Sequence, residues 1–164
     1  MGDYTTKLAK AAEAVLQPGE TLLAGTRAMT KGGTKGIVAG AAGAVAGGAA
    51  GMAVGNAVSR EDVAEGRAQA EGAEIGHAPQ VAVGLTSQRL LVWKRSGLSG
   101  KAKSILGEIP LERVRDMDGS DSRSKLKPDR LTVHLTDGSH VEFEVVKADG
   151  YESIVGEFQR LRSD

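Results

Sequence analysis

Apolar and polar positions alternate in two runs near the end of this chain of 164 residues. In residues 130–136 and again in residues 140–146, the larger apolar side chains occupy every second position. A period of two places them on one face of a β-strand. Asp137 and Gly138 lie between the runs and form a typical hairpin turn signal. The pattern therefore predicts two antiparallel strands joined by a tight turn.

Further stretches have the composition of strands, although their alternation is less regular. Residues 81–85 and 89–95 are nearly continuous apolar runs separated by a short polar turn. Residues 20–29 form a third stretch of mixed quality, and residues 104–117 read as one or two strands broken near Pro110. Together with the hairpin, they predict an antiparallel sheet that occupies most of the second half of the chain.

Helical spacing appears in three segments. Apolar residues recur every three or four positions in residues 4–16 and in a C-terminal segment that begins at Asp149. Residues 59–78 are polar and compatible with a helix, and Ser59-x-x-Asp62 is a plausible cap for a new helix at that point. The C-terminal segment is the best amphipathic helix, and its apolar face would cover the open end of a bent sheet.

The most unusual stretch is GIVAGAAGAVAGGAAGMAVGNAV, residues 36–58, which carries no charge and contains seven glycines and nine alanines. Most of the glycines recur every three or four residues, so that on a helix they form a stripe. Each costs roughly 1 kcal/mol relative to alanine in a helix interior, so an isolated helix of this kind would be unstable in water. The candidate helix-packing residues are Gly36, Gly40, Gly43, Gly47, Gly51 and Gly55.

Four interpretations of residues 36–58 remain open. The stretch is a disordered linker, a re-entrant or interfacial membrane hairpin that turns near Gly47-Gly48, a helix that packs against copies of itself, or a helix that packs against its own continuation, residues 59–76. A single membrane crossing is excluded if strands of one sheet both precede and follow it, since they would lie on opposite sides of the bilayer. The alanine content and the regular glycine spacing favour self-association, and we expect a homo-oligomer.

Four motifs make the chain resemble a bacterial PH-like domain, of the pleckstrin homology or GRAM-type superfold. They are PGETLLAG, GLTSQRLLVW, GEIPLERVRDMD and the pairing of LTVHLTDGSHVEFEV with a final amphipathic helix. The resemblance implies a barrel of about seven antiparallel strands capped by a C-terminal helix, with a binding role and no catalysis. It also implies a discontinuous domain, residues 18–30 and 79–164, interrupted by an insertion at 31–78 and preceded by an N-terminal helix in 1–17.

Composition narrows the classes of function. The 21 basic and 21 acidic residues balance, so the overall charge gives no indication of nucleic-acid binding. Cysteine is absent, which excludes disulfides and thiolate metal sites. Residues 1–16 lack the continuous apolar segment of a signal peptide. We therefore expect a cytoplasmic protein, with contact to the inner face of the plasma membrane as the alternative.

Candidate chemistry is sparse. The three histidines are scattered, and GLSGKA (97–102) fails the phosphate-loop pattern because Ala102 occupies the Ser/Thr position. We expect no catalytic centre, no cofactor and no metal site. The candidates for binding an anionic ligand or lipid are Lys94, Arg95, Lys101 and Lys103, which are either one binding face or ordinary solvated side chains. A second basic loop, residues 119–129, has the same two interpretations.

Overall fold

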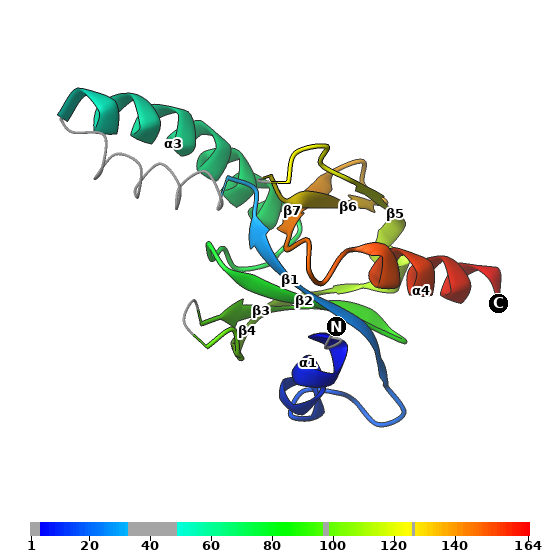
Figure 1. The fold of residues 1–164 in the computed structure, drawn as a ribbon. Helices are drawn as coiled ribbons and strands as arrows, with labels where there is room; N and C mark the ends of the chain where they lie inside the picture. The colour runs from blue at the N-terminus through cyan, green and yellow to red at the C-terminus, as the bar shows by residue number, and fades with distance from the viewer. Residues whose placement is uncertain (1–3, 33–48, 97–98, 126) are drawn as a thin grey trace.

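A computed structural model describes residues 4–32, 49–96, 99–125 and 127–164 of the chain. These residues form a seven-stranded antiparallel sheet with the order β4-β3-β2-β1-β7-β6-β5 (Figure 1). The strands are β1 (Leu22–Thr30), β2 (Val81–Thr86), β3 (Arg89–Arg95), β4 (Ala102–Pro110), β5 (Val114–Ser120), β6 (Asp129–Leu135) and β7 (His140–Val145). The helices are α1 (Tyr4–Glu13), α3 (Ala49–Gly72) and α4 (Glu152–Ser163), with a short 3₁₀ turn at Leu111–Arg113.

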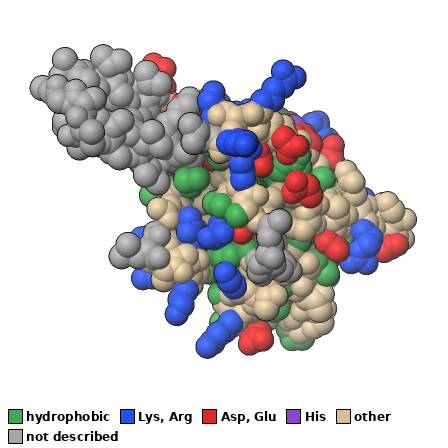
Figure 2. Space-filling view, viewed as in Figure 1, with side chains coloured by type: hydrophobic (Ala, Val, Ile, Leu, Met, Phe, Trp, Pro, Cys, Tyr) green, Lys and Arg blue, Asp and Glu red, His purple; other side chains and the backbone are tan. Residues whose placement is uncertain are grey.

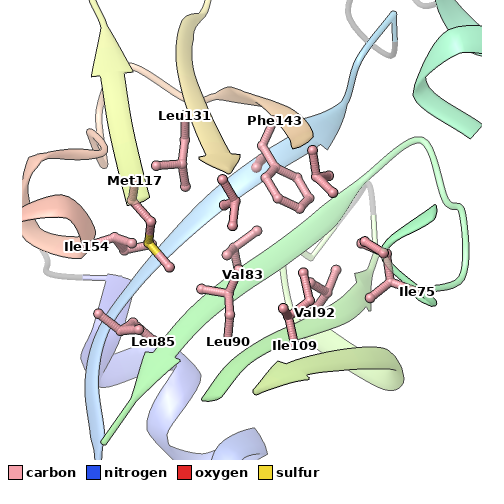
Figure 3. Packing of buried hydrophobic residues seen from close by; sticks show 14 of the residues in the cluster. Ile75, Val83, Leu85, Leu90, Val92, Ile109, Met117, Leu131, Phe143 and Ile154 are labelled. Atoms are coloured by element: carbon pink, nitrogen blue, oxygen red, sulfur yellow. The ribbon is translucent and has the colours of Figure 1, made fainter. Parts of the chain in front are cut away.

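Strand β1 joins two meanders into one sheet. Its first part pairs with β2, and its last three residues pair with β7, so β1–β4 and β5–β7 share this strand. The main core lies between the two halves of the bent sheet, where Val83, Val92 and Phe143 are completely buried (Figure 3). Ile154 and Phe158 of α4 complete this core. The prediction of a mainly β fold with seven antiparallel strands and a C-terminal helix is therefore confirmed.

Helix α1 packs on the outer face of the β1–β4 half. Leu8 is 1% exposed and joins Leu91 and Trp93 in a second hydrophobic cluster, separate from the main core. Gly25 and Gly84 leave room for this approach, since an added Cβ on either would lie within 3.0 Å of the Leu8 side chain. Strands β2 and β3 are therefore covered on both faces, which explains why their apolar runs are nearly continuous.

Helix α3 differs from the sequence prediction at its start. It runs without a break from Ala49 to Gly72, so Ser59 and Asp62 lie inside the helix and the predicted cap at Ser59 is wrong. The last part of the Gly/Ala-rich stretch, residues 49–58, is thus the first part of α3. In Figure 1 this part extends away from the sheet, whereas the C-terminal end of α3 meets β7 and β1.

The remaining boundaries shift by a few residues. The break near Pro110 is confirmed, because β4 ends there and the 3₁₀ turn separates it from β5. The β6–β7 hairpin turns at Asp137 and Gly138, and Gly138 has a φ of 89° that favours glycine. Helix α4 begins at Glu152 rather than at Asp149, whose side chain accepts hydrogen bonds from Arg27.

Candidate functional site

The four basic residues predicted as a binding face lie at the ends of two paired strands. Lys94 and Arg95 end β3, and Lys101 and Lys103 lie at the start of β4, where Arg95 pairs with Ala102. Lys94, Lys101 and Lys103 are exposed, while Arg95 is half-buried. We call these four residues the β3–β4 surface. Figure 2 shows several Lys and Arg side chains on one face of the molecule, over β3, β4 and α1.

Backbone hydrogen bonds hold the β3–β4 connection in place. The Ser96 amide donates to the carbonyl of Lys101 at 3.0 Å, and the Gly100 amide donates to the carbonyl of Ser96 at the same distance. Gly100 has a φ of 65°, and its carbonyl accepts a hydrogen bond from the Tyr4 hydroxyl of α1. The positions of Arg95 and Lys101 are therefore set by the sheet and by α1 together.

Arg95 is half-buried and forms no ion pair with a carboxylate among the described residues. Its Nε is sealed from solvent and has no hydrogen-bond acceptor among the described residues. Burial lowers the pKa of its guanidinium, and the nearby positive charge of Arg27 acts in the same direction. A buried donor that lacks an acceptor is rare in native proteins and calls for an explanation. Within the β3–β4 surface, Arg95 is thus the cation whose Nε is left without an acceptor among the described residues.

The neighbouring arginine, Arg27, forms an ion pair within the fold. Arg27 on β1 donates to both carboxylate oxygens of Asp149, from Nε at 2.6 Å and from Nη2 at 2.9 Å. Its guanidinium carbon also lies 5.6 Å from the centroid of the Tyr4 ring. The Asp149 side chain is only 4% exposed, so this pair is structural. The charge of Asp149 also acts on Arg95, where it opposes the lowering of the pKa by burial.

The insertion is anchored to the sheet by a polar cluster at the C-terminal half of α3. Lys31 Nζ lies 2.6 Å from Glu65 of α3 and 2.8 Å from Glu142 of β7. Gln69 of α3 accepts a hydrogen bond from the Glu142 amide at 3.0 Å. Burial alone would raise the pKa of Glu142, but hydrogen bonds from Lys31 and Gln69 outweigh it and lower the pKa. Ionic and amide contacts therefore fix the direction of α3 relative to β1 and β7.

Two glycines bring α3 and the end of β1 into backbone contact. A Cβ at Gly66 would lie 2.6 Å from the carbonyl oxygen of Lys31. A Cβ at Gly32 would lie 2.8 Å from Asp62 and Val63 of α3. Beyond this contact Ala70 and Ala73 enter the main core. These glycines lie outside the stripe predicted from the sequence, and their role follows from an approach that sequence spacing does not reveal.

Only part of the predicted glycine stripe lies among the residues that the structure describes. Gly51 and Gly55 lie in the first half of α3, four residues apart and hence on the same side of the helix. Gly36, Gly40, Gly43 and Gly47 lie outside the described residues. Self-association through these glycines stays a prediction.

Polar residues of the PGETLLAG and GLTSQRLLVW segments form a buried network. Glu20 accepts hydrogen bonds from the Thr86 hydroxyl at 2.6 Å and from two guanidinium nitrogens of Arg89, each at 2.9 Å. Arg89 also donates to the carbonyl of Val15 and contacts Glu108. This network ties the exit of α1 to the β2–β3 turn. These motif residues therefore have a structural role that was not predicted from the sequence.

The remaining polar candidates do not form a recognisable metal site. His134 and His140 pair across the β6–β7 hairpin with ring centroids 6.2 Å apart, and His134 Nε2 lies 2.6 Å from Asp118. Within the described residues, no group of three or more metal-binding side chains is placed to hold an ion.

In the second basic loop Arg123, Lys125 and Lys127 are exposed.

Comparisons with known proteins leave the chain without an assigned family. No family model matches the sequence, and no curated protein matches it. One similar solved structure is a DUF1696 family protein with a pleckstrin-homology domain from Shewanella loihica PV-4. It is 15% identical, with a TM-score of 0.36, and the match covers 51% of this chain and 68% of that chain. The seven-stranded antiparallel sheet with its C-terminal helix fits a PH-like fold.

Proposed function

We propose that this protein is a non-enzymatic PH-like binding module that self-associates through the Gly/Ala-rich part of its insertion. The observation that carries the proposal is the arrangement of α3. Its C-terminal half is anchored on β1 and β7 by Lys31, Gln69 and Glu142, while its first half extends away from the sheet (Figure 1). The sheet with α1 and α4 is then the body, and the projecting helix is the element that meets another copy.

The chemistry of the projecting part supports a protein partner. Residues 49–58 have no charged side chain, whereas residues 60–74 contain seven. A helix rich in glycine and free of charge has little intrinsic stability in water and gains stability by packing. Gly51 and Gly55 share one side of the helix, where the missing side chains would let a second backbone approach closely.

Membrane contact is the alternative, and the experiment must distinguish it from self-association. Within the described residues, no helix combines the length and the apolar character needed to cross a bilayer. An interfacial role would instead use the apolar part of the insertion together with the cations of the β3–β4 surface. Each cation near an anionic membrane would contribute about 1 kcal/mol.

The test compares three purified full-length proteins by sedimentation velocity and by flotation with anionic vesicles. They are the natural chain, the double variant Gly51→Leu/Gly55→Leu, and the control Gly72→Leu at the exposed end of the same helix, where an added Cβ meets no atom within 4 Å. Self-association predicts an oligomer for the natural chain and the control and a smaller species for the double variant. A monomeric natural chain that floats with vesicles would overturn the proposal in favour of membrane contact.

A further inference from the structure

Two histidines lie side by side at the end of the β6–β7 hairpin. His134 of β6 and His140 of β7 are direct partners in the register of the two strands. The Leu135 amide donates to the carbonyl of Ser139, so these two residues form a hydrogen-bonded pair and the adjacent histidines form a non-hydrogen-bonded one. Side chains lie closer together in pairs of the second kind. The hairpin therefore holds two imidazoles next to each other.

Both imidazoles face solvent. The flanking residues Val133 and Val141 are buried in the main core, and successive side chains of a strand point to opposite faces of the sheet. His140 is exposed, and the His134 side chain is 29% exposed. An ion in solution can therefore reach both rings.

The spacing of the two rings is close to that of a metal chelate. Their centroids are 6.2 Å apart, and the ring planes are inclined at 41°. Zinc binds histidine nitrogen at ~2.0–2.1 Å, which places the centroids of two imidazoles on one tetrahedral ion about 5 Å apart. The difference of about 1 Å is within the reach of a side-chain rotation at an exposed position.

Asp118 of β5 orients one of the two rings. Its Oδ2 lies 2.6 Å from Nε2 of His134. An ionised carboxylate only accepts hydrogen bonds, so Nε2 carries the hydrogen, and Nδ1 of the neutral ring keeps its lone pair. Histidines that bind metals commonly donate their other ring nitrogen to a carboxylate in this way. Asp118 thus sets the tautomer in which His134 can act as a ligand.

The charges around the histidine pair favour a cation. Asp116 is the partner of His134 on β5, and both Asp116 and Asp118 are exposed. In the part of the chain that the structure describes, the ion pairs of Lys and Arg involve other carboxylates. The negative charge beside His134 is therefore not neutralised by a basic side chain.

We propose that His134 and His140 bind one divalent transition-metal ion such as Zn²⁺, each through one imidazole nitrogen, with Asp118 positioning His134. No three protein ligands converge in the described residues, so the site is a two-histidine chelate, and water completes the coordination. Imidazole suits Zn²⁺, whereas Mg²⁺ prefers oxygen ligands. The site uses no residue of α3 and is independent of the proposed self-association.

The experiment is a calorimetric titration of the full-length chain, free of any histidine tag, with ZnCl₂ at pH ~7.5. His134→Gln and His140→Gln each remove one ligand. The matched control is His77→Gln, which removes the histidine between α3 and β2. Asp118→Asn keeps an acceptor oxygen but removes the charge. A parallel titration with MgCl₂ measures attraction to the acidic surface alone, and thermal melting without metal verifies that each variant is folded.

We expect the natural chain and His77→Gln to bind Zn²⁺ equally, and either His134→Gln or His140→Gln to bind it at least ~10-fold more weakly. Zn²⁺ should also raise the melting temperature of the natural chain and leave that of His140→Gln unchanged. Asp118→Asn should have an intermediate affinity, because it disturbs the orientation of His134 without removing a ligand. Unchanged affinity in Asp118→Asn would overturn the positioning role of that residue.

Two results would overturn the metal site itself. One is a natural chain that binds no Zn²⁺ at ~1 mM. The other is equal Zn²⁺ binding by the natural chain and His140→Gln, or an equal response to MgCl₂, because surface charge alone would then hold the ion. Sedimentation of the Gly51→Leu/Gly55→Leu variant tests self-association separately, so failure of one proposal is distinguishable from failure of the other.

Discussion

Arg89 on β3 donates two hydrogen bonds to the carboxylate of Glu20, which lies 69 positions earlier in the sequence. Its Nε is 2.9 Å from Oε1 and its Nη2 is 2.9 Å from Oε2. The Glu20 side chain is completely buried and the Arg89 side chain is 11% exposed. Thr86 at the β2–β3 turn donates its hydroxyl to the same carboxylate. The segment before β1 is thereby attached to the β2–β3 hairpin by a buried, charge-assisted network.

Replacing Glu20 by Gln is expected to destabilise the fold by about 2–3 kcal/mol, because Arg89 loses a charged acceptor in a buried place. Burial alone would raise the pKa of Glu20, but hydrogen bonds from Arg89 and Thr86 outweigh it and lower the pKa. A depressed carboxyl pKa adds stability that is complete above the ordinary value and is lost as pH falls through the folded value. Urea unfolding should therefore show a difference between the natural chain and Glu20→Gln that shrinks in acid. A difference independent of pH would contradict the assignment.

Gly66→Ala is expected to destabilise the protein although alanine favours helices. The new methyl would lie 2.6 Å from the backbone carbonyl oxygen of Lys31, so α3 or the end of β1 must shift. Overpacking of this kind costs about 1–3 kcal/mol, against a propensity gain of at most about 1 kcal/mol. Gly72→Ala, in open space on the same helix, is the control and should be neutral or slightly stabilising. Equal urea midpoints for the two variants would show that α3 does not require this close contact.

His77 is expected to make stability rise with pH. It lies in the connection between α3 and β2, with Nε2 3.1 Å from the Thr30 hydroxyl, and that hydroxyl donates to the carbonyl of Ala78. Burial lowers the pKa of His77, and the charge of Arg67 acts in the same direction. The unfolded chain then binds more protons than the folded one below the ordinary value, so stability rises as pH increases towards ~6.5 and levels off above it.

Comparing His77→Gln with the natural chain by urea unfolding at pH ~5.5 and ~7.5 tests this contribution of His77. The variant should lose part of the pH dependence in this range, because glutamine does not titrate there. His140→Gln, an exposed position, is the control. If the natural chain and His77→Gln respond identically to pH, the connection is not sensitive to protonation.

Leu8→Ala should loosen α1 from the sheet at a cost of about 2–5 kcal/mol, since Leu8 is 1% exposed and fits over Gly25 and Gly84. Hydrogen exchange should rise first in residues 4–13 if α1 can detach, and throughout β1–β4 if the helix and the sheet unfold together. The exposed change Lys10→Ala serves as the control. Unchanged stability in Leu8→Ala would mean that α1 adds little to the fold.

Local pattern was sufficient for much of the architecture. The β6–β7 hairpin was predicted from the alternation in residues 130–136 and 140–146, with Asp137-Gly138 between them. This works because successive side chains of a strand point to opposite faces of the sheet. Helical spacing of apolar residues predicted α4 and its buried face for an equally local reason. The basic residues from 94 to 103 could be grouped because a short connection between paired strands necessarily brings its ends together.

Other features depended on contacts that no local period encodes. The packing of residues 4–16 on the sheet depends on Gly25 and Gly84, two positions without side chains beneath Leu8. The predicted cap at Ser59 was wrong, because a local capping signal does not end a helix that continues through it. The Glu20–Arg89 pair and the Gly66–Lys31 contact join residues far apart in the chain. Sequence by itself determined which residues form strands and helices, since those depend on neighbours, while the tertiary structure decided which polar groups are buried together.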